Sequence, residues 1–414
     1  IPQRKRAVDQ TLERLGLAAR SNQLAGQLSG GWKQRLALAA CLLMRRIARA
    51  PQELRGADLR VVGLGVLIGL AALTRNEAIW LGLAWAIVAW RIPGLDPVAR
   101  ARAVGVAGVV ALLIFVPWMV RDWLVFGSPL PGQAAANALS VTGFDIFAWN
   151  DPPTLARYLA VGPARLLAMR VEGISHNLFS VLLLPGVPLS VIGLLALPWQ
   201  ARGEALRPVV LVSAIMFLVT SLAFPVATTW GTFLHAAGPA HVLLVISALL
   251  GLDAGIARLG VYRGWTRPVA WLGATLGVAG SLLFSAVLLP SFGAGSRETA
   301  TQYEELSRRM EAIGERLDQR GGPVISNFPI WLAETQRIPA LALPNEAPSD
   351  VVDLAETFDA RLLVLVGADH GQWPAVLSGG AADADCFRQL DLGAGPAGLP
   401  DPLADVRVYE VACP

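Results

Sequence analysis

Residues 103–120 read AVGVAGVVALLIFVPWMV, an uncharged apolar run long enough to cross the hydrocarbon core of a bilayer as one helix. Similar runs lie at about 61–74, 78–90, 177–198, 208–224, 238–256 and 268–289. Hydrocarbon offers backbone N–H and C=O groups no hydrogen-bond partner, so each run must be helical to pair these groups internally. The sequence therefore predicts a mainly α-helical, polytopic transmembrane bundle of about seven spans.

The composition supports a bilayer as the surrounding medium. Of the 414 residues, 54% are hydrophobic, which is too apolar for a water-soluble chain of this length. The formal net charge is only +3, and the basic residues are nearly all Arg in the gaps between apolar runs. This charge reports membrane topology, so we expect the lipid bilayer as a partner and no nucleic acid.

The Arg residues also predict the orientation in the membrane. They collect in the gaps 45–60, 91–102, 202–207 and 258–267, whereas 225–237 is uncharged and 121–176 mixes both signs. Positive charge is retained on the cytoplasmic side, so the Arg-rich gaps are predicted to be cytoplasmic. The loop 121–176 and the tail 291–414 are then extracytoplasmic, in a multi-pass protein of the cell inner (plasma) membrane. Trp118, Trp123, Trp149, Trp199 and Trp230 are expected to form an aromatic belt at the span ends.

The first 45 residues differ from the rest of the chain. Both Lys residues, Lys5 and Lys33, lie here, and an amphipathic helix is predicted over 8–17. Residues 28–39 read LSGGWKQRLALA, in which Ser29, Gly30 and Gly31 open a helix whose free N–H groups suit a phosphate. This segment resembles the signature motif of ABC-transporter ATPase domains. The resemblance implies that these three residues contact the γ-phosphate of ATP held by a partner subunit.

The other parts of an ATPase site are missing from the sequence. It contains no G-x-x-x-x-G-K-[ST] loop, and no apolar run ending in Asp-Glu follows Ala40. We therefore interpret residues 1–45 as a fused, chimeric fragment that does not bind ATP by itself, in front of a truncated membrane domain. The alternative is an ABC transporter-associated protein that binds ATP through the LSGG segment.

Three further segments carry a second resemblance. They read GLAALTRNE at 69–77, PWMVRDWLVFGSP at 117–129 and GTFLHAAG at 231–238. In this order they are similar to motifs of the GT-C polytopic membrane glycosyltransferases, of the protein-mannosyltransferase and aminoarabinose-transferase type. The resemblance covers about 60–414. It implies a transmembrane domain at 46–290, an extracytoplasmic α/β domain at 291–414, and transfer of a sugar from a polyprenyl-phosphate donor to an extracytoplasmic acceptor.

Such a donor has its phosphate at the membrane surface, where cations can bind it. Arg75, Arg121 and His235 lie at predicted outer span ends, and ionisable residues near a membrane are candidates for function. The alternatives stay open. Arg75 can pair with Glu77 or reach lipid headgroups, Arg121 can pair with Asp122, and His235 can be an ordinary interfacial residue.

Inverting sugar transfer also needs a carboxylate that takes the acceptor's proton. The GT-C enzymes carry it in the first outer loop, which no segment here matches. Glu77 and Asp122 are the candidates for this base, with Asp145 and Asp151 as further outer carboxylates. The resemblance thus implies an incomplete, inactive enzyme, in which a divalent cation can take part, although no metal-spaced His/Cys cluster occurs. A non-catalytic membrane scaffold is the alternative.

The tail has the pattern of a small α/β domain. Strands are predicted at 323–327, 361–366 and 406–411, with helices at 303–319 and 350–358. Asp369 and His370 follow the middle strand, where α/β sheets bind ligands, unless they are an ordinary loop pair. Cys386 and Cys413 both lie in this tail, and an oxidising compartment would permit a disulfide between them, the alternative being two free thiols.

Overall fold

The computed structural model describes residues 30–50, 58–74, 78–129, 132–200, 206–266, 269, 271–317, 322–367, 370–393, 395 and 400–413, with side chains from Leu36 onward. Ser29, Arg75 and Glu77 lie outside these residues, as do Asp369 and the helix predicted over 8–17. The chain forms two compact units. The first unit holds the described residues up to Ala134 together with Ala164–Phe284, and the second holds Ala135–Pro163 together with Ser285–Pro414.

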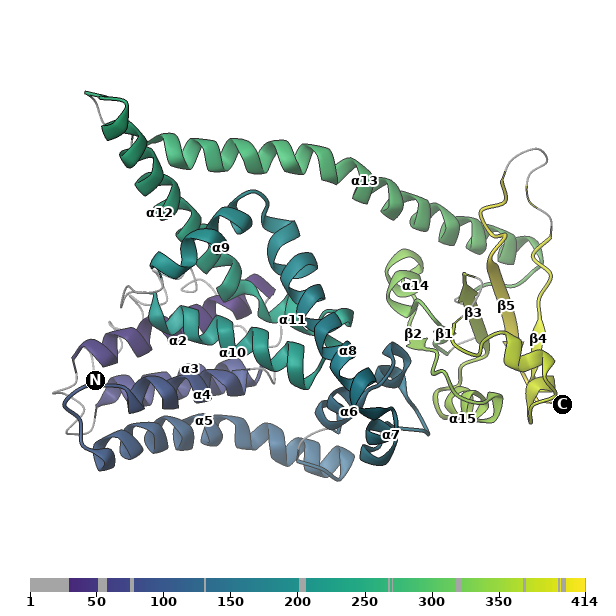
Figure 1. The fold of residues 1–414 in the computed structure, drawn as a ribbon. Coiled ribbons are helices and arrows are strands. Elements are labelled where there is room, and N and C mark those ends of the chain that lie inside the picture. The colour runs from purple at the N-terminus through teal and green to yellow at the C-terminus, as the bar shows by residue number, and fades with distance from the viewer. Residues whose placement is uncertain are drawn as a thin grey trace, which may run out of the picture. The chain divides into compact units, whose positions relative to one another are not determined.

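The first unit is helical (Figure 1). Its elements are α2 (Gly30–Arg49), α3 (Leu59–Ala72), α4 (Ile79–Trp90), α5 (Pro97–Phe126), α8 (Gly162–Ser175), α9 (Leu189–Gln200), α10 (Arg207–Ala223), α11 (Thr232–Ala236), α12 (Gly238–Tyr262) and the start of α13 (Trp271–Ala312). Four helical stretches in the described part of the chain are long and apolar enough to cross a membrane: 97–126, 162–186, 238–262 and 271–312.

The outward surfaces of these four stretches are apolar. Only 11–28% of the residues in their most apolar windows are buried inside the structure, and Leu113, Leu124 and Leu283 are 66%, 79% and 71% exposed. Exposed apolar area on this scale is typical of a protein whose solvent is lipid. Shorter apolar helices lie at α3, α4, α9 and α10. The membrane environment is thus supported, and the count of seven spans stays a prediction.

The single span expected at 177–198 is wrong. Helix α8 continues through a π-helical stretch, His176–Leu183, and a 3-10 turn, Leu184–Gly186, and a separate helix α9 begins at Leu189. Pro185 and Pro188 flank the break, and a proline ring cannot donate the N–H that an uninterrupted helix needs. Hydropathy alone does not reveal this break because the residues on both sides are apolar.

Close packing of small residues holds α3 against α5. A Cβ atom added at Gly65 would lie 2.6 Å from the Ala107 carbonyl oxygen, and one at Gly69 would lie 2.9 Å from that of Ala111. Since residue numbers rise together along both helices, α3 and α5 run parallel. Small residues at such crossings let membrane helices approach closely.

Helix α2 extends across the fragment boundary that the sequence analysis placed at residue 45. Its buried residues Leu36, Ala40, Cys41, Met44 and Ile47 belong to the same hydrophobic core as α3, α4, α5 and α10. Leu36, Ala40, Met44 and Ile47 lie three or four positions apart, which puts them on one helical face, and Cys41 lies beside Ala40. The described part of the LSGG-like segment is therefore built into the helical unit.

Helix α13 joins the span expected at 268–289 and the charged helix expected at 303–319 into one element of 42 residues. Pro290 lies inside it without ending it. Prolines are tolerated inside apolar helices when neighbouring groups compensate for the missing hydrogen bond. The predicted separation of these two helices is therefore wrong.

The second unit contains a five-stranded sheet in the order β2-β1-β3-β5-β4. Its strands are β1 (Val324–Ser326), β2 (Ala340–Ala342), β3 (Leu362–Val366), β4 (Phe387–Gln389) and β5 (Val406–Val411), with α14 (Pro329–Gln336) and α15 (Pro348–Phe358) between them. Strands β1, β2 and β3 are parallel, and β5 pairs antiparallel with both β3 and β4. The tail thus contains the small sheet with helices that its sequence pattern predicts.

The loop expected at 121–176 contains more structure than predicted. It includes the end of α5, the short helices α6 (Gln133–Leu139) and α7 (Leu155–Ala160), and all of α8, which begins the apolar stretch 162–186. Its middle part, Ala135–Pro163, belongs to the same compact unit as the sheet. This placement depends on contacts between residues about 200 positions apart, which a local pattern cannot show.

Candidate functional site

The last turns of α5 carry the strongest candidate residues. Arg121 Nη1 donates a hydrogen bond to Asp122 Oδ1 at 2.8 Å, and Asp122 is only 1% exposed. Helix α5 then ends at Gly127, whose φ of 69° is accessible to glycine at little cost. The structure therefore forms the Arg121–Asp122 pair that the sequence analysis kept as an alternative.

Only one oxygen of the buried Asp122 carboxylate accepts a hydrogen bond from a described residue. Its second oxygen, Oδ2, is buried and has no hydrogen-bond partner among the described residues. Leaving a buried acceptor unpaired costs about 1–3 kcal/mol, so such an atom needs an explanation. Because neither oxygen reaches the surface, Asp122 is placed to hold Arg121 and not to touch an acceptor directly.

Arg121 itself is open to the surroundings. Half of its side chain is exposed, and its guanidinium carbon lies 4.7 Å from the centre of the Trp118 ring and 5.8 Å from that of Phe126. Cation–π contacts and the bond to Asp122 fix the guanidinium without using all of its N–H donors. The remaining donors suit an anion with several oxygens, such as a phosphate.

The other predicted donor-binding residues have different positions. His235 is exposed on α11, a short helix anchored by buried Phe233, whose ring packs against Phe217. In Figure 1, α10 and α5 both end toward the same end of the helical unit, and α11 follows α10 there. Arg75 and Glu77 follow α3, which runs parallel to α5, but they lie outside the described residues.

The two further outer carboxylates are occupied by their own loop. Asp145 accepts the backbone N–H groups of Val141 and Thr142 at 2.6 and 2.9 Å and forms an ion pair with Arg157. Asp151 also pairs with Arg157, at 3.0 Å. These contacts stabilise the loop. Trp149, expected in the aromatic belt, donates its indole N–H to Asp353 in the same unit at 2.8 Å.

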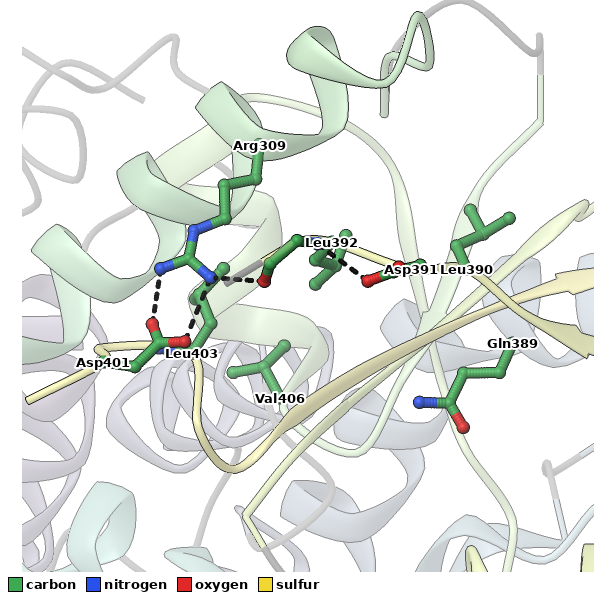
Figure 2. A pocket seen from close by; sticks show the side chains of 9 residues that line it. Arg309, Gln389, Leu390, Asp391, Leu392, Asp401, Leu403 and Val406 are labelled. Atoms are coloured by element: carbon green, nitrogen blue, oxygen red, sulfur yellow. Dashed lines mark hydrogen bonds and ion pairs between the residues drawn. The ribbon is translucent and has the colours of Figure 1, made fainter. Parts of the chain in front are cut away.

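A polar pocket of about 330 Å³ lies in the second unit (Figure 2). Arg309 lies at its wall and is 5% exposed. Its Nε donates to Glu305 at 2.7 Å, and its Nη1 donates to Asp401 at 3.1 Å and to the Gly393 carbonyl at 3.3 Å. The Arg309 guanidinium also holds the pKa of Asp401 below its usual value. Since the cation is neutralised by two carboxylates, the pocket has little capacity for a further anion.

His370 is a packed residue of the second unit. Its Nε2 lies 3.3 Å from the Leu343 carbonyl oxygen, and its ring meets the edge of Phe144 with centroids 4.7 Å apart. Burial lowers the pKa of this imidazole, so the neutral form is favoured. These contacts give His370 a structural role beneath the Ala135–Pro163 segment.

The remaining predicted site residues are placed as follows. Cys386 and Cys413 form a disulfide with an S–S distance of 2.11 Å. Gly30 and Gly31 are the first two residues of α2. No group of three or more His, Cys, Asp or Glu side chains that could hold a metal ion occurs among the described residues, so the divalent cation implied by the resemblance is assigned no ligands.

No protein-family model and no curated protein matches this chain. The similarity to GT-C glycosyltransferases and to the ABC signature therefore rests on the quoted motifs alone.

Proposed function

We propose that this chain is a GT-C-like membrane protein that binds a polyprenyl-phosphate-linked sugar donor at the end of α5 and takes part in sugar transfer to an extracytoplasmic acceptor. The observation that carries the proposal is Arg121, a half-exposed guanidinium fixed by a buried carboxylate at the end of an apolar helix. The apolar polyprenyl chain of the donor would lie along exposed apolar helices while the donor's phosphate binds Arg121.

In this proposal the donor phosphate accepts hydrogen bonds from Arg121. As the acceptor oxygen bonds to the anomeric carbon, the bond from that carbon to the phosphate breaks and polyprenyl phosphate leaves. Arg121 stabilises the negative charge that develops on the leaving phosphate. Asp122 is a positioning residue that holds the guanidinium, and the base that takes the acceptor's proton is not assigned to any described residue.

The placement of the units follows from the Arg pattern. With the Arg-rich gaps on the cytoplasmic side, the end of α5 and the second unit face away from the cytosol. The protein would then reside in the inner (plasma) membrane with its α/β domain outside. A disulfide between Cys386 and Cys413 is compatible with that oxidising side.

The proposal is tested with donor binding in detergent and with release of polyprenyl phosphate from a radiolabelled lipid-linked sugar. Arg121→Gln should weaken donor binding about tenfold or more, because a hydrogen bond to a charged group contributes about 1.5–3 kcal/mol. Arg165→Gln is the matched control, since Arg165 is exposed on α8 of the same unit. Equal binding by wild type and Arg121→Gln would contradict the donor site. Binding without release would leave a non-catalytic scaffold as the function.

A further inference from the structure

A shallow, open surface groove of about 400 Å³ lies along the last turn of α4, and nothing in the donor-site proposal uses it. Its lining consists of Ala86, Ile87, Trp90 and Arg91. Three of these side chains are apolar, and Trp90 is 57% exposed. Amphipathic Trp rings prefer the depth of the membrane–water interface. The groove therefore combines an apolar floor with one cation at its end.

The cation at this groove has unused hydrogen-bond donors. The exposed side chain of Arg91 has no hydrogen-bond or ion-pair partner within the described ranges. Nearby, Arg100 Nη2 donates to the Ile92 carbonyl at 3.2 Å, while its Nε is buried without a partner among the described residues. The neighbouring acid, Asp96, accepts the Ala99 N–H at 2.8 Å as the N-cap of α5. The Arg91 guanidinium at the end of α4 can thus still donate to an anion.

We propose that this groove binds an anionic phospholipid, with one acyl chain along Ala86, Ile87 and Trp90 and the phosphate headgroup on Arg91. Charge complementarity selects this occupant, because a zwitterionic lipid offers no net charge to Arg91 and a free phosphate cannot fill the apolar floor. Basic pockets beside membrane helices bind anionic headgroups by this chemistry.

The lipid site is distinct from the donor site. Arg100 lies in the first turns of α5 and Arg121 in its last turns, about 30 Å away at the helical rise per residue. The two sites thus face opposite surfaces of the membrane. By the Arg pattern, the α4 end is the cytoplasmic side, where anionic lipids attract basic residues.

The test uses the full chain purified in neutral detergent, to which phosphatidylglycerol or phosphatidylcholine is added, with retained lipid counted by native mass spectrometry. Wild type should retain phosphatidylglycerol in preference to phosphatidylcholine. Arg91→Gln should lower this retention about fivefold, the effect of one Arg near an anionic surface. Ala86→Leu fills the groove while keeping every charge, and it should lower retention as well.

Arg258→Gln is the control, because Arg258 is an exposed residue near the end of α12 and lies in another Arg-rich gap. It should leave retention unchanged. The proposal is overturned if Arg258→Gln lowers retention as much as Arg91→Gln, which would indicate unspecific charge attraction. Equal retention of both lipids, unchanged retention in Ala86→Leu, or displacement of the lipid by millimolar inorganic phosphate would overturn it too.

Discussion

The carboxylate of Glu346 accepts the backbone N–H of Trp149 at 2.7 Å, although 197 positions of sequence separate the two residues. The same carboxylate accepts the N–H groups of Asn150 at 2.9 Å and Asp151 at 3.0 Å, and Glu346 is only 7% exposed. One buried acid thus satisfies three successive backbone donors of the Ala135–Pro163 segment. This contact fastens that segment to the α/β domain within the second unit.

Glu346→Ala should release the segment at Trp149. Removing a buried carboxylate leaves three N–H donors without their partner, so we expect a loss of about 3 kcal/mol of stability in the second unit. Hydrogen exchange of the amides at 149–151 should accelerate strongly. Glu356→Ala is the matched control, because Glu356 is exposed on α15 and should leave the exchange rates unchanged. Protected amides at 149–151 in Glu346→Ala would contradict this role.

His370 should make the second unit more stable at alkaline than at mildly acidic pH. Burial lowers the pKa of this imidazole below its ordinary value of 6.5, so the folded state binds fewer protons than the unfolded state in that range. The stabilisation is present above the ordinary pKa and is lost as the pH falls through the folded value. Unfolding of the detergent-solubilised chain at pH 8 and pH 5 should show this difference.

His370→Gln should reduce that pH dependence, whereas His235→Gln should keep it, because His235 is exposed in the other unit. An identical pH profile in wild type and His370→Gln would show that His370 does not cause the pH dependence of stability.

The pair of Arg309 and Asp401 should make the second unit sensitive to stronger acid. The guanidinium holds the pKa of Asp401 below its ordinary value of 3.8. The ion pair therefore stabilises the folded unit above pH 3.8, and this stabilisation is lost as the pH falls through the pKa of Asp401 in the folded protein. Asp401→Asn should weaken the unit at neutral pH and flatten its acid transition. Asp385→Asn is the control, since no ion pair of Asp385 occurs among the described residues. Parallel acid transitions in wild type and Asp401→Asn would show that the Arg309–Asp401 pair does not cause the acid sensitivity.

Gly65→Ala should loosen the packing of α3 on α5. The added Cβ would lie 2.6 Å from the Ala107 carbonyl oxygen, closer than real Cβ contacts, and overpacking of this kind costs about 1–3 kcal/mol. Gly105→Ala is the control, because a Cβ there meets nothing within 4 Å. Thermal unfolding in detergent measures the stability of both variants. An unchanged midpoint in Gly65→Ala would disprove the close approach of the two helices.

Millimolar ATP with Mg²⁺ should leave the melting temperature of the chain unchanged. The described residues of α2 bury Ala40, Met44 and Ile47 in the core of the first unit, and the sequence holds no phosphate-binding loop. A ligand that binds the folded state would raise the melting temperature by mass action. A rise that depends on ATP concentration would instead support the alternative hypothesis, an ABC transporter-associated protein that binds ATP through Ser29, Gly30 and Gly31.

The sequence by itself determined the features that depend on near neighbours. Runs such as 103–120 predict apolar helices, and the short apolar run 362–366 predicts a strand, because each pattern is complete within one element. Helix α15 and strands β1 and β5 were predictable for the same reason. Strands β2 and β4 were not predicted, since they exist through their pairing with β1 and β5, which the local sequence does not show.

Only the tertiary structure decided which charged residues meet. Arg121 and Asp122 are neighbours whose pairing the sequence left open, and only the structure shows that Asp122 is buried with its Oδ2 unpartnered among the described residues. Glu346 with Trp149, and Arg309 with Asp401, join residues that are 197 and 92 positions apart. Such contacts are selected by the packing of whole elements, because a hydrogen bond acts over about 3 Å and leaves no periodic trace in the chain.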